Sequence, residues 1–139
     1  MKKSLFFIAT LLFSASSFAA TDHYILRDGN HVQHLKITKL KDDITVSADV
    51  DFEPNVDETG KHACSAEVSG DAKQVAENEL VMKKRIEGEA KNCSLKIHLT
   101  PNGAKLEQSE DCSYYAAGIC HFTSDGKELL KIKQAAKKL

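Results

Sequence analysis

Apolar and polar residues alternate one by one along several stretches of this chain, and this period constrains the fold more than any other feature. Successive side chains of a β-strand point to opposite faces, so strict alternation predicts strands with one buried and one exposed face. The clearest stretch runs from Ile44 to Phe52, where every second residue is apolar and those between are polar. The same alternation recurs in residues 35–38, 64–69, 93–99 and 104–106. Residues 80–86 show a weaker version of it.

Turn-forming residues separate these stretches and complete a fold prediction. They lie at positions 28–30, 41–43, 70–71, 88 and 101–103. Strands with one polar face are typical of antiparallel sheets whose other face packs on a core. We therefore predict an all-β fold, a small antiparallel meander that closes into a sandwich or a barrel. The polar residues 53–60 are predicted to form a long loop.

The C-terminal residues support two competing predictions. Asp125 and Glu128 have the spacing of a helix capping box, and apolar residues then recur near helical spacing as far as Leu139. This pattern predicts a short C-terminal helix. The competing prediction is a last strand through Leu130 and Ile132, followed by a tail.

Residues 1–19 have the three parts of a secretory signal peptide. Two lysines precede an apolar run at 4–14, and small residues follow, with Ser17 and Ala19 at −3 and −1 of a cleavage site. The apolar run is shorter than the roughly 20 residues that span a membrane, which favours a cleaved signal. We expect a periplasmic protein in which residues 20–139 form a single disulfide-stabilised β domain.

The charge balance of the predicted domain gives no reason to expect nucleic acid or an anionic membrane as a partner. Two of the 19 Lys and Arg residues lie in the signal peptide, which leaves 17 against 20 Asp and Glu, a net charge of −3. Binding to phosphate groups needs a positive surface instead. The sequence has no second apolar run long enough to cross a membrane, so we expect no stable membrane insertion.

Four cysteines lie in the predicted domain, and an even number in a small exported chain implies disulfides. Four cysteines allow three pairings. Cys64 and Cys93 each occupy the apolar face of an alternating strand, where paired strands bring side chains close enough to bond. Cys112 and Cys120 flank a short segment that a disulfide would close. We therefore expect the pairs Cys64–Cys93 and Cys112–Cys120, both structural, because neither has the Cys-x-x-Cys spacing of a redox centre.

Motifs that carry catalysis are absent from the sequence. There is no G-x-S-x-G turn, no H-E-x-x-H pair and no glycine-rich phosphate loop. The acidic residues fall mostly in turn-like stretches, and a small β domain without Trp leaves little room for an aromatic-lined sugar cleft. We expect a protein that is not an enzyme and that uses no cofactor.

Six histidines raise the alternative of a metal or small-ligand site. His31 and His34 are three residues apart, which places them on opposite faces of a strand. The spacing of the histidines matches none of the compact zinc patterns. We therefore assign no metal ligand and keep, as the alternative function, a periplasmic small-ligand or metal-binding module that uses histidine.

The segment from Cys112 to Cys120 has the most unusual composition of the predicted domain, with Tyr114, Tyr115 and Gly118 among small residues. Tyrosine offers a large contact area with few rotatable bonds, which suits recognition. A disulfide that fixes such a loop lowers the cost of ordering it on binding. The alternative is that both tyrosines only cover the end of the sheet. We take Tyr114, Tyr115 and Gly118 as the predicted binding residues.

Three features of residues 62–130 occur together: a strand at 90–99 that carries one core cysteine, the cysteine-rich segment 112–120, and an Asp-Gly turn at 124–127. In these features the chain resembles small exported β proteins of proteobacteria, among them periplasmic lysozyme inhibitors and immunity proteins that block peptidoglycan-cleaving toxins. The resemblance implies a protein that inhibits a protein partner, a cell-wall hydrolase, by occluding its cleft. The Ser-Gly-x-x-Tyr type of loop expected of c-type lysozyme inhibitors is absent, so no contact residue is carried over.

Overall fold

The computed structural model describes residues 19–55, 60, 62–116 and 118–132. Within these residues the chain forms strands connected in sequence order, with two short 3-10 helices before the last strand. The strands are β1 (Ala20–Asp28), β2 (His31–Leu40), β3 (Asp43–Phe52), β4 (Cys64–Ala76), β5 (Glu79–Arg85), β6 (Asn92–Leu99), β7 (Gly103–Gln108) and β8 (Leu129–Ile132). The 3-10 helices are η1 (Glu110–Tyr114) and η2 (Gly118–Cys120). The predicted signal peptide lies outside the described residues except for Ala19.

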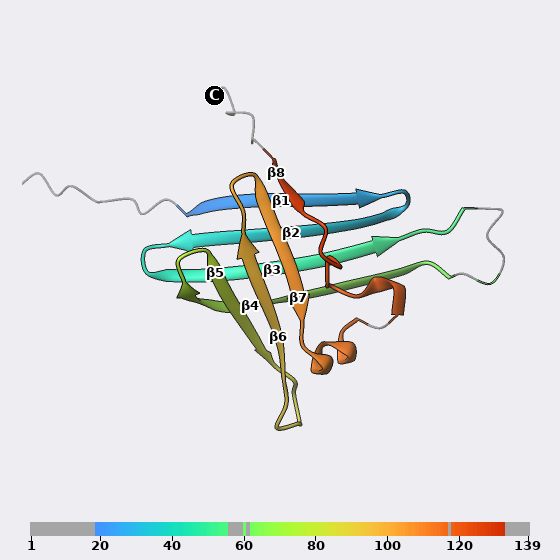
Figure 1. Ribbon diagram of the computed structural model, residues 1–139. Coiled ribbons are helices and arrows are strands. Elements are labelled where there is room, and N and C mark those ends of the chain that lie inside the picture. Colours follow the sequence, from blue (N-terminus) through green and yellow to red (C-terminus); the bar gives the residue numbers. More distant parts are fainter. Residues whose placement is uncertain (1–18, 56–59, 61, 117, 133–139) are drawn as a thin grey trace, which may run out of the picture.

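The sheet closes into a barrel, because each strand pairs antiparallel with the next and β8 also pairs with β1. The predicted all-β antiparallel meander is confirmed, and of the two predicted closures the barrel is the one found. Figure 1 shows β1 to β4 running side by side across the view, with β5 to β7 crossing them steeply. Among the described residues, no helix has the length and apolar character needed to cross a membrane.

The alternation in the sequence places apolar side chains inside the barrel. In β3, Val46 and Val50 are almost fully buried, whereas Thr45 and Asp51 are exposed. A barrel of this strand number has an interior just wide enough for side chains to fill. The largest fully buried apolar side chains include Leu35, Met82, Ile86, Leu95, Ile97, Leu106, Phe122 and Leu129. Their removal from water, at roughly 25 cal/mol per Å² of apolar surface, is the main force that stabilises the fold.

Gly70 lies inside a strand, although Gly70-Asp71 is predicted from the sequence to form a turn. β4 continues past this point to Ala76, and Gly70 pairs with Val46 of β3. A Cβ at Gly70 would lie 3.0 Å from the sulfur of Met82. The glycine therefore serves close packing within the sheet rather than a reversal of the chain.

Where it is described, the C-terminus is a strand, so the helix prediction is wrong for residues 129–132; residues 133–139 lie outside the described residues. Asp125 and Gly126 have positive φ angles of 54° and 78°, and the Lys127 N–H donates to the Ser124 carbonyl at 3.0 Å. Two consecutive positive φ angles form a tight turn. An N-terminal helix cap needs an extended backbone instead, so Asp125 cannot act as that cap.

Gly103 allows β7 and β8 to approach closely where the barrel closes. It pairs with Leu130, and a Cβ at Gly103 would overlap with the backbone carbonyl oxygen of Leu129. The approach of the two backbones therefore requires glycine at this position. The seam of the barrel depends on this contact, because β7 and β8 share few paired residues.

The disulfides join Cys64 to Cys120 and Cys93 to Cys112, with Cα atoms 6.2 Å and 4.4 Å apart. The prediction that all four cysteines form disulfides is confirmed. The predicted pairing of Cys64 with Cys93 and of Cys112 with Cys120 is wrong.

The strand register explains why Cys64 and Cys93 do not meet. Met82 of β5 pairs with Ala72 of β4 on one side and with Leu95 of β6 on the other. Cys64 lies eight residues before Ala72, and Cys93 lies two residues before Leu95. The two cysteines are thus offset by six residues, roughly 20 Å of extended chain, and β5 lies between their strands. Both cysteines lie on an apolar strand face, as predicted. Alternation, however, does not show which strands are neighbours or which of their residues are paired.

Candidate functional site

The predicted binding residues Tyr114 and Tyr115 form an edge-to-face pair at the end of η1. Their ring centroids are 5.2 Å apart at an interplanar angle of 84°, and Tyr114 is 64% exposed. The Tyr115 hydroxyl donates a hydrogen bond of 3.4 Å to the carbonyl oxygen of Arg85, at the end of β5. Cys112, bonded to Cys93 of β6, holds this turn of chain against the barrel.

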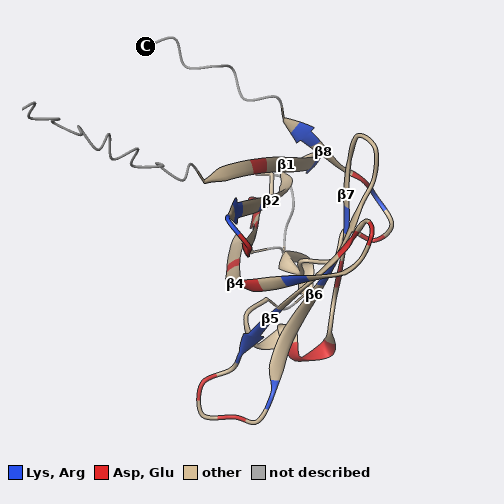
Figure 2. Ribbon diagram, turned by 90° about the vertical axis from the view of Figure 1, so that its left-hand side faces the viewer, with Lys and Arg blue, Asp and Glu red and all other residues tan. Residues whose placement is uncertain are grey.

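A surface cavity of about 660 Å³ lies beside the tyrosine pair. Its lining, which we call the tyrosine surface, consists of Lys84, Arg85, Glu87, Gly88, Tyr114 and Tyr115. Figure 2 shows basic residues at the end of β5, with acidic residues in the turn that follows. Such a surface can bind a partner that offers apolar area to the rings and carboxylates to the two cations.

Gly118, the third predicted binding residue, does not lie at the tyrosine surface. It begins η2 with a φ of +63°, and its carbonyl oxygen accepts a 2.8 Å hydrogen bond from Nδ1 of His121. The neighbouring carbonyl of Ile119 contacts Nε2 of His31 at 2.7 Å. The structure therefore divides the predicted loop: its tyrosines face the end of β5, and its glycine faces the start of β2.

A second cavity, of about 260 Å³, lies beside η2 and was not foreseen from the sequence. His31, Gln33 and His121 are among the residues that line it. Gln33 is only 2% exposed, and its amide nitrogen donates to the carbonyl oxygens of His121 and Thr123 at 3.2 Å and 3.0 Å. Its amide oxygen is buried and has no hydrogen-bond partner among the described residues.

His121 is held by hydrogen bonds at both ring nitrogens. Nδ1 donates to the Gly118 carbonyl, and Nε2 donates to a carboxylate oxygen of Asp125 at 2.9 Å. Burial lowers the pKa of His121, but the hydrogen bonds to the Gly118 carbonyl and to Asp125 outweigh burial and raise this pKa above its ordinary value. His121 is therefore protonated more readily than an ordinary histidine.

One sequence signal points to this second cavity. Gln33 occupies an inward position of β2, in the same alternating set as the buried residues Leu35 and Ile37. A polar residue inside such a set needs hydrogen-bond partners in the core. The sequence alone does not say that those partners come from residues 121–123, almost ninety positions later.

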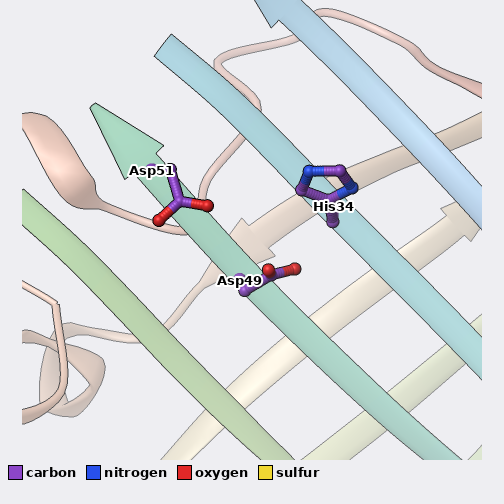
Figure 3. A group of neighbouring side chains, drawn as sticks. All are labelled: His34, Asp49 and Asp51. Carbon is purple, nitrogen blue, oxygen red and sulfur yellow. The ribbon is translucent and has the colours of Figure 1, made fainter. Parts of the chain in front are cut away.

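His31 and His34 lie on opposite faces of β2, as their spacing predicts. His31 faces the second cavity, whereas His34 lies on the outer face of the barrel. There, Nδ1 of His34 is 3.0 Å from Nε2 of His23 on β1. Figure 3 shows His34 beside Asp49 and Asp51 of β3, and one ligand atom from each of these three residues lies within 4.8 Å of the others.

The electrostatics of this outer group reflect partial burial. Burial raises the pKa of Asp49. The neighbouring Asp51 and Glu67 also raise this pKa, whereas His34 and Lys36 lower it. Burial, His34 and Lys36 lower the pKa of His23, so that His23 favours its neutral form and can accept a hydrogen bond.

No family model, curated protein or solved structure matches this chain.

Proposed function

We propose that this protein is a periplasmic binding protein that inhibits a cell-wall hydrolase by occluding the cleft of the enzyme. The tyrosine surface carries the proposal, because it presents a largely exposed aromatic ring beside exposed Lys84 and Arg85. Aromatic residues and arginine supply most of the binding energy at protein interfaces. The Cys93–Cys112 disulfide anchors the tyrosine pair to β6 before any partner binds, which lowers the ordering cost of association.

The chemistry of the surface supports a hydrolase that acts on sugar chains. Most enzymes of this kind place two carboxyl groups in a cleft that accommodates sugar rings. Tyr114 offers a flat ring of suitable shape, and Arg85 can pair with a carboxylate through two parallel hydrogen bonds. The predicted signal peptide and the two disulfides support an oxidising compartment outside the cytoplasm. We propose that the protein acts by binding and not by catalysis.

The test is an inhibition assay with purified cell walls and a panel of lysozyme-type hydrolases. The loss of turbidity is measured with and without the protein. We expect the wild-type protein to slow at least one hydrolase, and Tyr114→Ala to raise the inhibition constant by roughly 30-fold, as for a central interface residue. Arg85→Ala is expected to act in the same direction.

Val75→Ala is the matched control, because Val75 is also exposed, at 58%, but lies near the end of β4, beside the start of β5, whereas the tyrosines lie at the end of β5. This variant should inhibit as the wild type does. Inhibition of no hydrolase in the panel would overturn the proposal. Full inhibition by a folded Tyr114→Ala variant would show that the tyrosine surface is not the site of contact.

A further inference from the structure

We propose that His34, Asp49 and Asp51 form a binding site for a divalent transition metal ion, and that zinc is the ion their chemistry fits. The three side chains lie together on the outer face of β2 and β3 (Figure 3). None of them lines the tyrosine surface, so the site is independent of the function proposed above.

The strand register brings the three side chains together. His34 is the direct cross-strand partner of Asp49, and Asp51 is two residues further along β3, on the same face. Their ligand atoms lie within 4.8 Å of one another. Zinc binds nitrogen and oxygen at about 2.0–2.2 Å in tetrahedral geometry, so ligand atoms around one ion are about 3.4 Å apart. Small side-chain rotations at a surface position are enough to close this difference.

His23 supplies the supporting contact that a metal-bound histidine needs. A histidine that binds a metal through one ring nitrogen almost always donates the N–H of the other nitrogen to a neighbouring acceptor. Nδ1 of His34 lies 3.0 Å from Nε2 of His23, so the His34 N–H can donate to a neutral His23. When His34 is the donor in this contact, its Nε2 is free to bind a metal ion. In Figure 3 one ring nitrogen of His34 lies on the side towards the aspartates.

The surrounding charges also favour a bound cation. Asp49 pairs across the sheet with His34 on one side and with Glu67 of β4 on the other. Asp51 adds another carboxylate, and Lys36 is the cation that acts on Asp49 from the same face. Like charges on neighbouring strands destabilise a sheet. A dication bound by Asp49 and Asp51 would relieve this repulsion.

The donor set favours zinc over the common hard cations. Calcium takes six to eight oxygen ligands, and magnesium usually keeps several waters while bound by one or two carboxylates. An imidazole nitrogen suits zinc, copper and nickel better than either hard cation. One imidazole with two carboxylates gives three ligands and leaves a fourth position for water or for another group.

Isothermal titration of the purified, untagged protein with zinc chloride tests the site after treatment with a chelator. We expect one zinc ion per chain, and no comparable binding of magnesium or calcium. His34→Gln and Asp51→Asn should each weaken zinc binding at least tenfold, because each removes a ligand. His23→Gln keeps all three ligands and should weaken binding by roughly tenfold, as loss of a supporting contact does.

His98→Gln is the control, because His98 is an exposed histidine on the outer face of β6 and should bind zinc no differently from the wild type. The near-isosteric Asp51→Asn, at an exposed position, keeps the test valid if His34→Gln does not fold. Absence of stoichiometric zinc binding in the wild type would overturn the proposal. Wild-type affinity in a folded Asp51→Asn or His34→Gln variant would overturn it too.

Discussion

Cys120 is bonded to Cys64, the first residue of β4, although 56 positions separate them in the chain. The other disulfide, 19 positions apart, fastens Cys112 to β6 through Cys93. The segment 112–120 is therefore not a self-closed loop. It connects two strands of the barrel and is fixed to a different strand at each end.

Removal of either disulfide should destabilise the protein, and the wider link should matter more. Replacement of Cys64 and Cys120 by serine is expected to lower the free energy of unfolding by about 4 kcal/mol, and replacement of Cys93 and Cys112 by about 3 kcal/mol, from loop-closure entropy. Urea unfolding monitored by circular dichroism measures both. A peptide that links Cys112 to Cys120 in a non-reducing digest would contradict the connectivity.

Gly103→Ala should weaken the seam of the barrel. The added Cβ overlaps with the Leu129 carbonyl, so β7 and β8 must move apart. Forced overpacking of this kind costs about 1–3 kcal/mol in the free energy of unfolding. Amide exchange at Lys131, whose N–H donates to the Asn102 carbonyl, should accelerate as well. Lys105→Ala, at an exposed position of the same strand, is the control and should leave both quantities unchanged.

Gln33→Leu should be destabilising in spite of its apolar surroundings. The change removes the donor that serves the carbonyl oxygens of His121 and Thr123. Loss of a buried donor, partly offset by removal of the unpartnered amide oxygen, is expected to cost about 1–2 kcal/mol of unfolding free energy. Gln74→Leu, at an exposed glutamine, should have no comparable effect in the same thermal or urea unfolding experiment. Equal stability of Gln33→Leu and the wild type would show that these bonds contribute no more than the unpartnered amide oxygen costs.

His121 should make the stability of the protein depend on pH. Burial lowers its pKa, but the hydrogen bonds to the Gly118 carbonyl and Asp125 raise it overall, so folding favours the protonated ring. The resulting stabilisation is complete below the pKa of the unfolded chain, 6.5, and is lost as the pH rises through the folded-state pKa. The difference in unfolding free energy between wild type and His121→Gln should therefore be larger at about pH 5.5 than at about pH 8.5.

An NMR titration of the His121 ring checks the same prediction directly. Asp125→Asn removes the negative charge beside Nε2 of His121 and should lower the measured pKa. A difference in stability that grows with rising pH would contradict the sign of the effect.

Much of the barrel can be predicted from the alternation of apolar and polar residues. What this alternation cannot predict has physical reasons. The strand ending at Phe52 and the one at 93–99 have a strict period of two, because one face of each is buried and the other is exposed. β1 lacks this signal, since Tyr24, Ile25 and Leu26 are apolar in succession. Alternation shows on which face of the sheet a side chain lies, but not which residue of a neighbouring strand lies opposite it. The error in the predicted disulfide pairing follows from that.

The candidate sites are less predictable, because they depend on contacts between distant segments. Tyr114 is exposed, but the disulfide beside it joins Cys112 to Cys93 and not, as predicted, to Cys120. The metal-binding group was missed: Asp49 and Asp51 fit the alternating pattern as ordinary exposed residues, and only the register places Asp49 opposite His34. The prediction that His31 and His34 lie on opposite faces of a strand is correct, because it depends only on their spacing of three residues.

The short strand β8 is the last strand in the chain, and both disulfides fasten the stretch of chain that leads to it. In a reducing compartment neither covalent link forms. The connection to the closing strand is then held to the sheet by noncovalent contacts alone, among them the hydrogen bonds from Gln33 to the carbonyls of His121 and Thr123. The two disulfides shorten the free chain between β7 and β8, so we expect the barrel to close more readily in the oxidised chain than in the reduced chain.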